Sequence, residues 1–161
     1  MLKHQKGVKE IMMHENTWGF FIYLFRHKET GEEYYRFFSP DKDVWDVQHR
    51  LYWVHHRQNR GYDLVSMRKV FKDEYLNTRI NIRVDEYLEQ DKYEQEVRQQ
   101  WKDREITDKV AIETIEMIQS HKTCLVKQMG TLIRRCRYAD IDVDNEIALA
   151  RYDEHLKNLR N

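Results

Sequence analysis

The sequence predicts an α+β fold, in which a small antiparallel sheet (a β-hairpin plus a third strand) packs with helices and precedes a C-terminal helical hairpin. Three observations support this prediction. Only five glycines and one proline occur in 161 residues, which favours long helices with few breaks. Aromatic and β-branched residues cluster near the N-terminus, as is typical of strands. Apolar residues recur at helical spacing over the last third of the chain.

The β-hairpin is predicted over residues 18–27 and 33–39, joined by a short polar turn that contains one glycine. An amphipathic helix is expected next, over residues 43–60. The apolar residues expected on its inward face are Val44, Val47, Leu51 and Val54.

The third strand is predicted over residues 79–88, where apolar and polar residues alternate. The other predicted elements are helices over 63–75, 91–104, 107–137 (continuous, or broken near Ser120) and 142–159. This order divides the chain into an α+β domain over residues 1–105 and a helical extension over residues 106–161. The extension is expected to be a packing hairpin, or else a surface for a second copy or a partner.

The chain contains 28 basic and 28 acidic residues, so its formal net charge is zero. This balance argues against a nonspecific nucleic-acid coat. It conceals a local excess of five positive charges over residues 49–83 and of four negative charges over residues 85–105. With 12% aromatic residues the chain has enough apolar surface for a folded core.

Two other patterns concern the compartment of the protein. No run approaches the roughly 18 apolar residues that a membrane span needs, and the N-terminal residues lack the apolar core of a signal peptide. The two cysteines, Cys124 and Cys136, are both on one predicted helix. About 18 Å of helix separates them, which is too far for a disulfide bond. We therefore expect a cytoplasmic protein with no membrane partner.

The hairpin carries a family resemblance. The segment from Phe21-Ile22-Tyr23 to Tyr34-Tyr35-Arg36 resembles the opening of a GIY-YIG nuclease domain, in which two strands carry two tyrosines on either side of a polar turn. The resemblance covers residues 18–104, and Phe21 and Arg36 stand where the family has glycines. In that family, two helices, a third strand and a helix with a metal-binding glutamate follow the hairpin.

The resemblance implies Mg²⁺-dependent hydrolysis of a phosphodiester if catalysis is retained, and no cofactor if it is not. Glu96 would hold the Mg²⁺ ion. Tyr23 would help to deprotonate water, with His49 or His56 as general base. The implied catalytic residues are Tyr23, Tyr34, Arg50 and Glu96. The alternative is that the tyrosines are packing partners across the hairpin.

The predicted helix over residues 43–60 also carries a stripe of aromatic, histidine and arginine side chains. Such a stripe suits phosphates and unstacked bases, and it suits a protein interface equally well. The alternative is a solvated basic face with the tryptophans tucked beneath the hairpin. The candidate binding residues are Trp45, His49, Trp53, His56, Arg57 and Arg60.

The sequence therefore favours a small binding protein that acts on nucleic acid or on a nucleic-acid-handling complex, without retained catalysis. One alternative is a metal-dependent endonuclease of the GIY-YIG type. Another is an interaction or assembly protein of viral or mobile-element origin that docks on a larger protein complex. Homo-oligomers through the C-terminal helices are compatible with each of these functions. No zinc-ligand spacing and no phosphate-binding loop occurs in the sequence.

Overall fold

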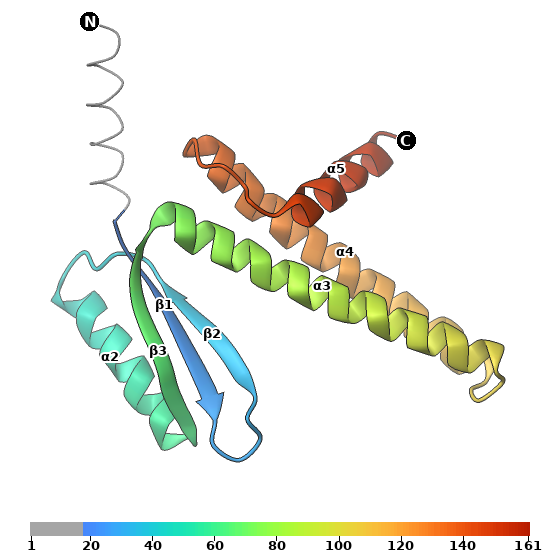
Figure 1. The fold of residues 1–161 in the computed structure, drawn as a ribbon, viewed down its shortest axis with the longest axis horizontal. Coiled ribbons are helices and arrows are strands. Elements are labelled where there is room, and N and C mark those ends of the chain that lie inside the picture. The colour runs from blue at the N-terminus through green and yellow to red at the C-terminus, as the bar shows by residue number, and fades with distance from the viewer. Residues whose placement is uncertain (1–17) are drawn as a thin grey trace, which may run out of the picture. The chain divides into compact units, whose positions relative to one another are not determined.

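The computed structural model describes residues 18–161, which form three strands and four helices (Figure 1). The predicted α+β class, with an antiparallel sheet and C-terminal helices, is confirmed. The elements are β1 (Trp18–His27), β2 (Glu33–Phe38), α2 (Val44–Asn59), β3 (Tyr62–Phe71), α3 (Lys72–Lys102), α4 (Asp108–Tyr138) and α5 (Glu146–Arg160).

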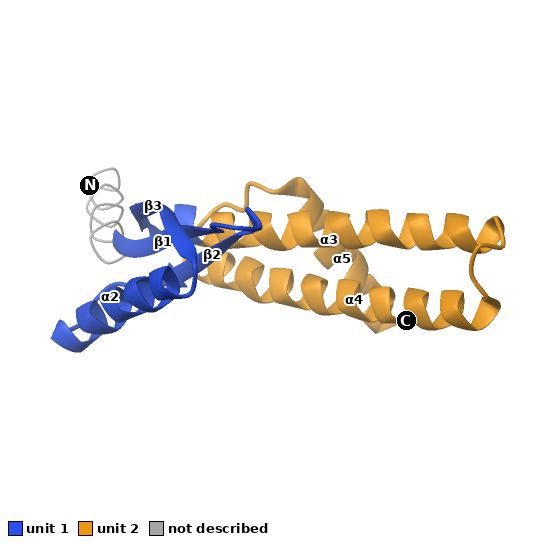
Figure 2. Cartoon of the chain, turned by 90° about the horizontal axis from the view of Figure 1, so that it is seen from below, with its two compact units in different colours: residues 1–75 blue, residues 76–161 orange. Residues whose placement is uncertain are grey.

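The chain divides into two compact units, Met1–Tyr75 and Leu76–Asn161 (Figure 2). The boundary predicted near residue 105 lies in the loop between α3 and α4, inside the second unit. No helix within residues 18–161 is long and apolar enough to cross a membrane.

The first unit is built on an antiparallel sheet with the strand order β2-β1-β3. The predicted hairpin of β1 and β2 is confirmed, with Tyr23 opposite Arg36 and Phe25 opposite Tyr34. Side chains alternate between the two faces of a strand, so Phe21, Tyr23 and Phe25 form the buried core of one face. α2 covers this face, and Val54 is one of the side chains that pack against that core.

The third strand is not the predicted one. It is β3 at Tyr62–Phe71, where the spacing of apolar residues had predicted a helix. β3 pairs with β1 along its length, for example Leu64 with Phe25 and Met67 with Tyr23. This long-range pairing satisfies the backbone of residues 62–71, and it outweighs a local apolar spacing that fits a helix by coincidence.

The strand predicted over residues 79–88 is wrong, because these residues belong to the long helix α3. Leu76, Ile80, Val84 and Tyr87 are all buried, and they recur at the spacing of one helix face. Ile80 and Val84 are four residues apart, a spacing that fits both a strand and a helix. A helix brings all four buried side chains to one side, whereas a strand would place Tyr87 on the opposite side from the other three.

The connection from α2 to β3 depends on Gly61. Its φ of 87° lies in the left-handed region that favours glycine, and its amide donates to the carbonyl of Gln58 at 3.3 Å. α2 therefore stops and the chain reverses directly into β3.

The second unit consists of helices, with α3 and α4 side by side (Figure 2). α4 is one continuous helix over Asp108–Tyr138, without a break near Ser120. α5 docks on α4 through Tyr152, whose ring lies against Gly130. The cysteines differ in exposure: Cys124 is exposed and Cys136 is buried.

Candidate functional site

The candidate site is on and beneath α2 in the first unit. Asp43 begins this helix, and its carboxylate accepts a hydrogen bond from the amide of Asp46 at 3.0 Å. No residue of α2 is fully buried. Eight residues of α2 are half-buried, and the four of them with contacts to side chains of the sheet are Arg50, Trp53, Val54 and Arg57.

The predicted inward face of α2 is therefore only half right. Val47 and Val54 are half-buried as expected, but Val44 and Leu51 are 70% and 57% exposed. Arg50, Trp53 and Arg57 take the remaining space over the sheet, because the aromatic core beneath them can stack on guanidinium groups.

Arg50 is part of an internal network. Its Nη1 donates to the Tyr23 hydroxyl at 2.7 Å, its Nη2 donates to Asp41 at 2.6 Å, and its guanidinium lies 3.8 Å from the centre of the Phe21 ring. Burial lowers the pKa of Arg50, but the hydrogen bonds to Asp41 and Tyr23 outweigh this effect and raise the pKa overall. Arg50 holds α2 on the sheet, and its side chain is only 11% exposed.

Both hairpin tyrosines pack in the core beneath α2. Tyr23 has no exposed surface, and its ring meets the Phe38 ring at 5.3 Å. The Tyr34 ring stacks on Phe25 at 5.3 Å, and its hydroxyl is buried without a hydrogen-bond partner. These contacts are the packing role that was the alternative to catalysis.

Glu96 is exposed on α3, in the second unit, whereas Tyr23, Tyr34 and Arg50 are in the first. The four residues implied by the family resemblance therefore do not belong to one unit. Within residues 18–161 no group of three or more histidine, cysteine or acidic side chains is arranged to hold a metal ion.

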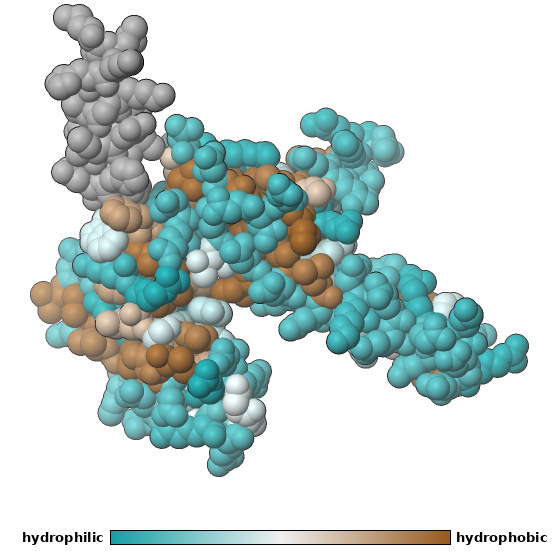
Figure 3. Space-filling view, in the orientation of Figure 1, coloured by the Kyte–Doolittle hydropathy of each residue, from teal (hydrophilic) through white to brown (hydrophobic). Residues whose placement is uncertain are grey.

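The outer face of α2, which we define as Val44, Trp45, Leu51 and Tyr52, is apolar and exposed. Trp45 and Tyr52 are 65% and 63% exposed. Two histidines flank this face: the His49 ring stacks on Trp45 at 5.0 Å, and the His56 ring lies 5.9 Å from Tyr52. Hydrophobic residues at the surface of the first unit are visible in Figure 3.

The predicted stripe thus separates into two groups. Trp45, His49 and His56 lie on or beside the outer face, whereas Trp53 and Arg57 turn toward the sheet. Arg60 is exposed just beyond the end of α2.

The sequence analysis did not identify Arg36 as a binding residue. Its guanidinium lies 4.4 Å from the Trp53 ring centre. The signal was present in the sequence, because Tyr34 and Arg36 are two residues apart on a predicted strand and therefore share a face.

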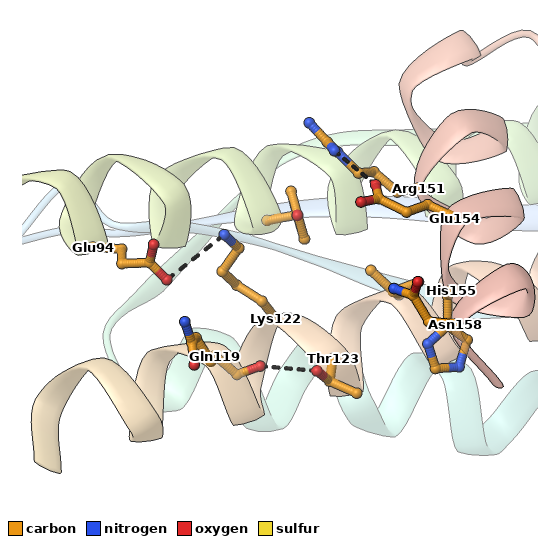
Figure 4. Close-up of a pocket in the computed structure, with 10 residues that line it drawn as sticks. Glu94, Gln119, Lys122, Thr123, Arg151, Glu154, His155 and Asn158 are labelled. Atoms are coloured by element: carbon orange, nitrogen blue, oxygen red, sulfur yellow. Dashed lines mark hydrogen bonds and ion pairs between the residues drawn. The ribbon is translucent and has the colours of Figure 1, made fainter. Parts of the chain in front are cut away.

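The second unit has a cleft of about 390 Å³ that α3, α4 and α5 line (Figure 4). Lys122 is its central cation, and it is ion-paired with Asp91 and with Glu94. Arg151 is likewise paired with Glu154 at 3.1 Å. Each cation of the cleft that comes from α4 or α5 thus already has a carboxylate partner, which leaves little unbalanced charge for a ligand.

Comparison with known proteins does not identify a family. No protein-family model matches the chain, and neither a curated protein nor a solved structure is significantly similar to it. The function is therefore argued from the residues of this chain.

Proposed function

We propose that this protein is a binding module that docks on a protein partner through the outer face of α2. The observation that carries the proposal is that four large apolar side chains of one helix are each more than half exposed. Large exposed apolar patches mark interaction sites, and tryptophan and tyrosine are the residues that most often dominate binding energy at protein interfaces.

The spacing of the outer face indicates the shape of the partner. Val44 and Trp45 form one pair, and Leu51 and Tyr52 form a second pair seven residues later, about 10.5 Å along the helix. A helix that presents anchors at this spacing suits an apolar groove on another protein. We therefore propose a partner that receives α2 in a groove with two apolar pockets.

Charge favours a protein over nucleic acid at this face. Binding to a phosphate backbone needs cations beside the aromatic rings. The outer face has no lysine or arginine, since Arg50 and Arg57 turn toward the sheet. Of the predicted binding arginines, only Arg60 is exposed, and it follows the last residue of α2.

The test is a Trp45→Ala/Tyr52→Ala variant, with Gln48→Ala as the matched control on the same helix. A partner identified by crosslinking is purified and titrated against each variant. We expect the double variant to lose about 30-fold or more in affinity, equivalent to about 2 kcal/mol. Its free energy of unfolding should change little, since both side chains are exposed.

Wild-type affinity in the double variant would contradict the proposal. Sedimentation of the isolated protein tests whether a second copy of this chain covers the outer face. A dimer that dissociates in the double variant would assign the face to a second copy.

The endonuclease alternative predicts a different result. Mg²⁺-dependent cleavage of DNA or RNA, lost in Glu96→Ala and kept in Glu113→Ala, would support it. We expect no such cleavage, because the Tyr23 hydroxyl is buried and already hydrogen-bonded to Arg50. Cleavage that depends on Glu96 would overturn this expectation.

A further inference from the structure

Three arginines of the first unit, Arg36, Arg57 and Arg60, have no negative partner among the described residues. Arg26, Arg50 and Arg68 are ion-paired with Glu33, Asp41 and Glu74. Within the part of the chain that the structure describes, no ion pair or hydrogen bond involves the side chain of Arg36 or Arg57. Arg36 and Arg57 are half-buried, whereas Arg60 is exposed.

Arg36 and Arg57 lie together around Trp53. Their guanidinium carbons are 4.4 and 4.5 Å from the centre of the Trp53 ring, so they are less than about 9 Å apart. Arg57 also lies 5.3 Å from the centre of the Tyr34 ring. β2 contributes Arg36 and Tyr34 to this cluster, and α2 contributes Arg57 and Trp53.

Three polar atoms of this cluster are buried and have no hydrogen-bond partner: the Tyr34 hydroxyl, Nε of Arg36 and Nε of Arg57. A buried polar group without a partner costs about 1–3 kcal/mol, and such groups are rare in folded proteins. The terminal nitrogens of the two guanidinium groups are not among these buried atoms. The arrangement has donors and positive charge, and it lacks an acceptor.

We propose that Arg36, Arg57 and Tyr34 form a binding site for a phosphate-class oxyanion at the edge between β2 and α2. Each guanidinium presents a planar fork of donors that matches two oxygens of a phosphate. The four oxygens of a tetrahedral anion can accept from two arginines and one hydroxyl that approach from different directions.

The state of Tyr34 fits this role. Burial raises the pKa of its hydroxyl, while Arg57 and Arg36 act in the opposite direction. Tyr34 is therefore a neutral phenol at pH 7 and a hydrogen-bond donor to an anion.

This site is independent of the docking function proposed for the outer face of α2, because the two share no residue. It shares Tyr34 with the residues that the family resemblance implies, but it depends on Arg36 and Arg57 and on no metal. The phosphate can come from solution or from the backbone of a nucleic acid. Titrations with inorganic phosphate and with an oligonucleotide distinguish these two sources.

The experiment titrates the full chain by calorimetry with inorganic phosphate and, separately, with a single-stranded oligonucleotide. The variants are Arg36→Gln, Arg57→Gln and Tyr34→Phe. Arg26→Gln is the control, since Arg26 is an exposed arginine of the same hairpin with its own ion pair. We expect wild type and Arg26→Gln to bind alike, each arginine variant to bind at least tenfold more weakly, and Tyr34→Phe to bind several-fold more weakly.

Melting temperatures distinguish a variant that has lost the binding site from one that has failed to fold. Phosphate should raise the melting temperature of wild type and Arg26→Gln in proportion to binding, and it should not raise that of Arg57→Gln. Tyr34→Phe keeps the ring and its packing, so it tests the hydroxyl in a folded protein.

The outcomes separate as follows. Oligonucleotide binding that is much tighter than phosphate binding, and that Arg57→Gln weakens, supports the site with a nucleic-acid backbone as its ligand. Phosphate binding without this gain supports the site with a small anion as its ligand. Absence of binding to both ligands, or binding that the arginine variants leave unchanged, overturns the proposal.

Discussion

Arg50 has three contacts at once: an ion pair with Asp41, a hydrogen bond to Tyr23 and a stacking contact with Phe21. The family resemblance implied a catalytic role for Arg50. Its partners are 9 and 27 residues away in sequence, so no local pattern could reveal them. In the folded protein Arg50 is an internal clamp between α2 and the sheet.

We predict that Arg50→Ala lowers the free energy of unfolding by about 2 kcal/mol, since it leaves the buried Tyr23 hydroxyl without a partner. Arg50→Lys should recover only part of this loss, because an ammonium cannot contact Asp41 and Tyr23 in the same geometry. Urea denaturation measures both variants. The exposed Arg60→Ala is the control and should stay within about 0.5 kcal/mol of wild type. An Arg50→Ala variant as stable as wild type would show that the clamp contributes nothing.

Gly130 has a steric role in the contact between α4 and α5. A methyl group added at this position would lie 2.5 Å from the Tyr152 ring, and Arg134 holds that ring through its hydroxyl at 2.8 Å. We predict that Gly130→Ala destabilises the protein by about 1 kcal/mol or more, because overpacking costs about 1–3 kcal/mol and outweighs the gain in helix propensity of about 1 kcal/mol. Thermal unfolding by circular dichroism measures this effect. Ser120→Ala, at an exposed site of α4, should not be destabilised, and a stabilised Gly130→Ala would show that Tyr152 can move aside.

At the scale of elements, the contact between α3 and α4 includes an ion pair whose strength depends on pH. Lys122 is 16% exposed and lies between Asp91 and Glu94. Burial lowers the pKa of Lys122, but the hydrogen bond to Asp91 and the nearby negative groups outweigh it and raise the pKa above its usual value of 10.5. A raised pKa in the folded protein means that protonated Lys122 stabilises the fold.

This stabilisation is fully present below pH 10.5 and is lost as pH rises through the higher pKa of the folded state. We predict that Lys122→Gln costs about 1–2 kcal/mol at pH 7 and that its difference from wild type shrinks above about pH 10.5. Denaturation of both proteins between pH 7 and 11.5 measures this difference. The exposed Lys127→Gln on the same helix controls for general alkaline effects, and a difference that does not change with pH would contradict the prediction.

The elements also show which parts of the fold the sequence can predict. The β1–β2 hairpin and α4 were predicted closely because the polar turn of one and the long helical spacing of the other are local signals. The predicted types of β3 and of the start of α3 were interchanged. Residues 64, 67 and 70 fit the spacing of a helix, and residues 80, 82 and 84 fit that of a strand. Only the pairing of β3 with β1, which joins residues about 40 positions apart, resolves this ambiguity.

At the scale of the whole molecule, the local charge excess is partly neutralised. Of the positive residues over 49–83, Arg50, Arg68 and Arg83 have carboxylate partners in Asp41, Glu74 and Glu86. The sequence left open whether the positive and negative stretches would pair with each other. Arg83 pairs with Glu86 of the negative stretch, whereas Arg50 and Arg68 pair with acids outside that stretch.

We therefore predict a weak salt dependence for any binding to single-stranded nucleic acid. If Arg36 and Arg57 are the cations that contact the backbone, at most two phosphates are neutralised, and log K should fall with log salt at a slope no steeper than about −1.4. Fluorescence anisotropy between 50 and 300 mM NaCl measures the slope. A much steeper slope would show that other lysines and arginines form the binding surface.

The exposure of the two cysteines has a practical consequence. They are the only cysteines in the chain, both are on α4, and the first unit has none. A thiol reagent will modify exposed Cys124 at once, whereas Cys136 reacts only when the core around it opens. In a Cys124→Ser protein, the rate of Cys136 labelling therefore reports how often the helical unit opens in native conditions, with no contribution from the sheet.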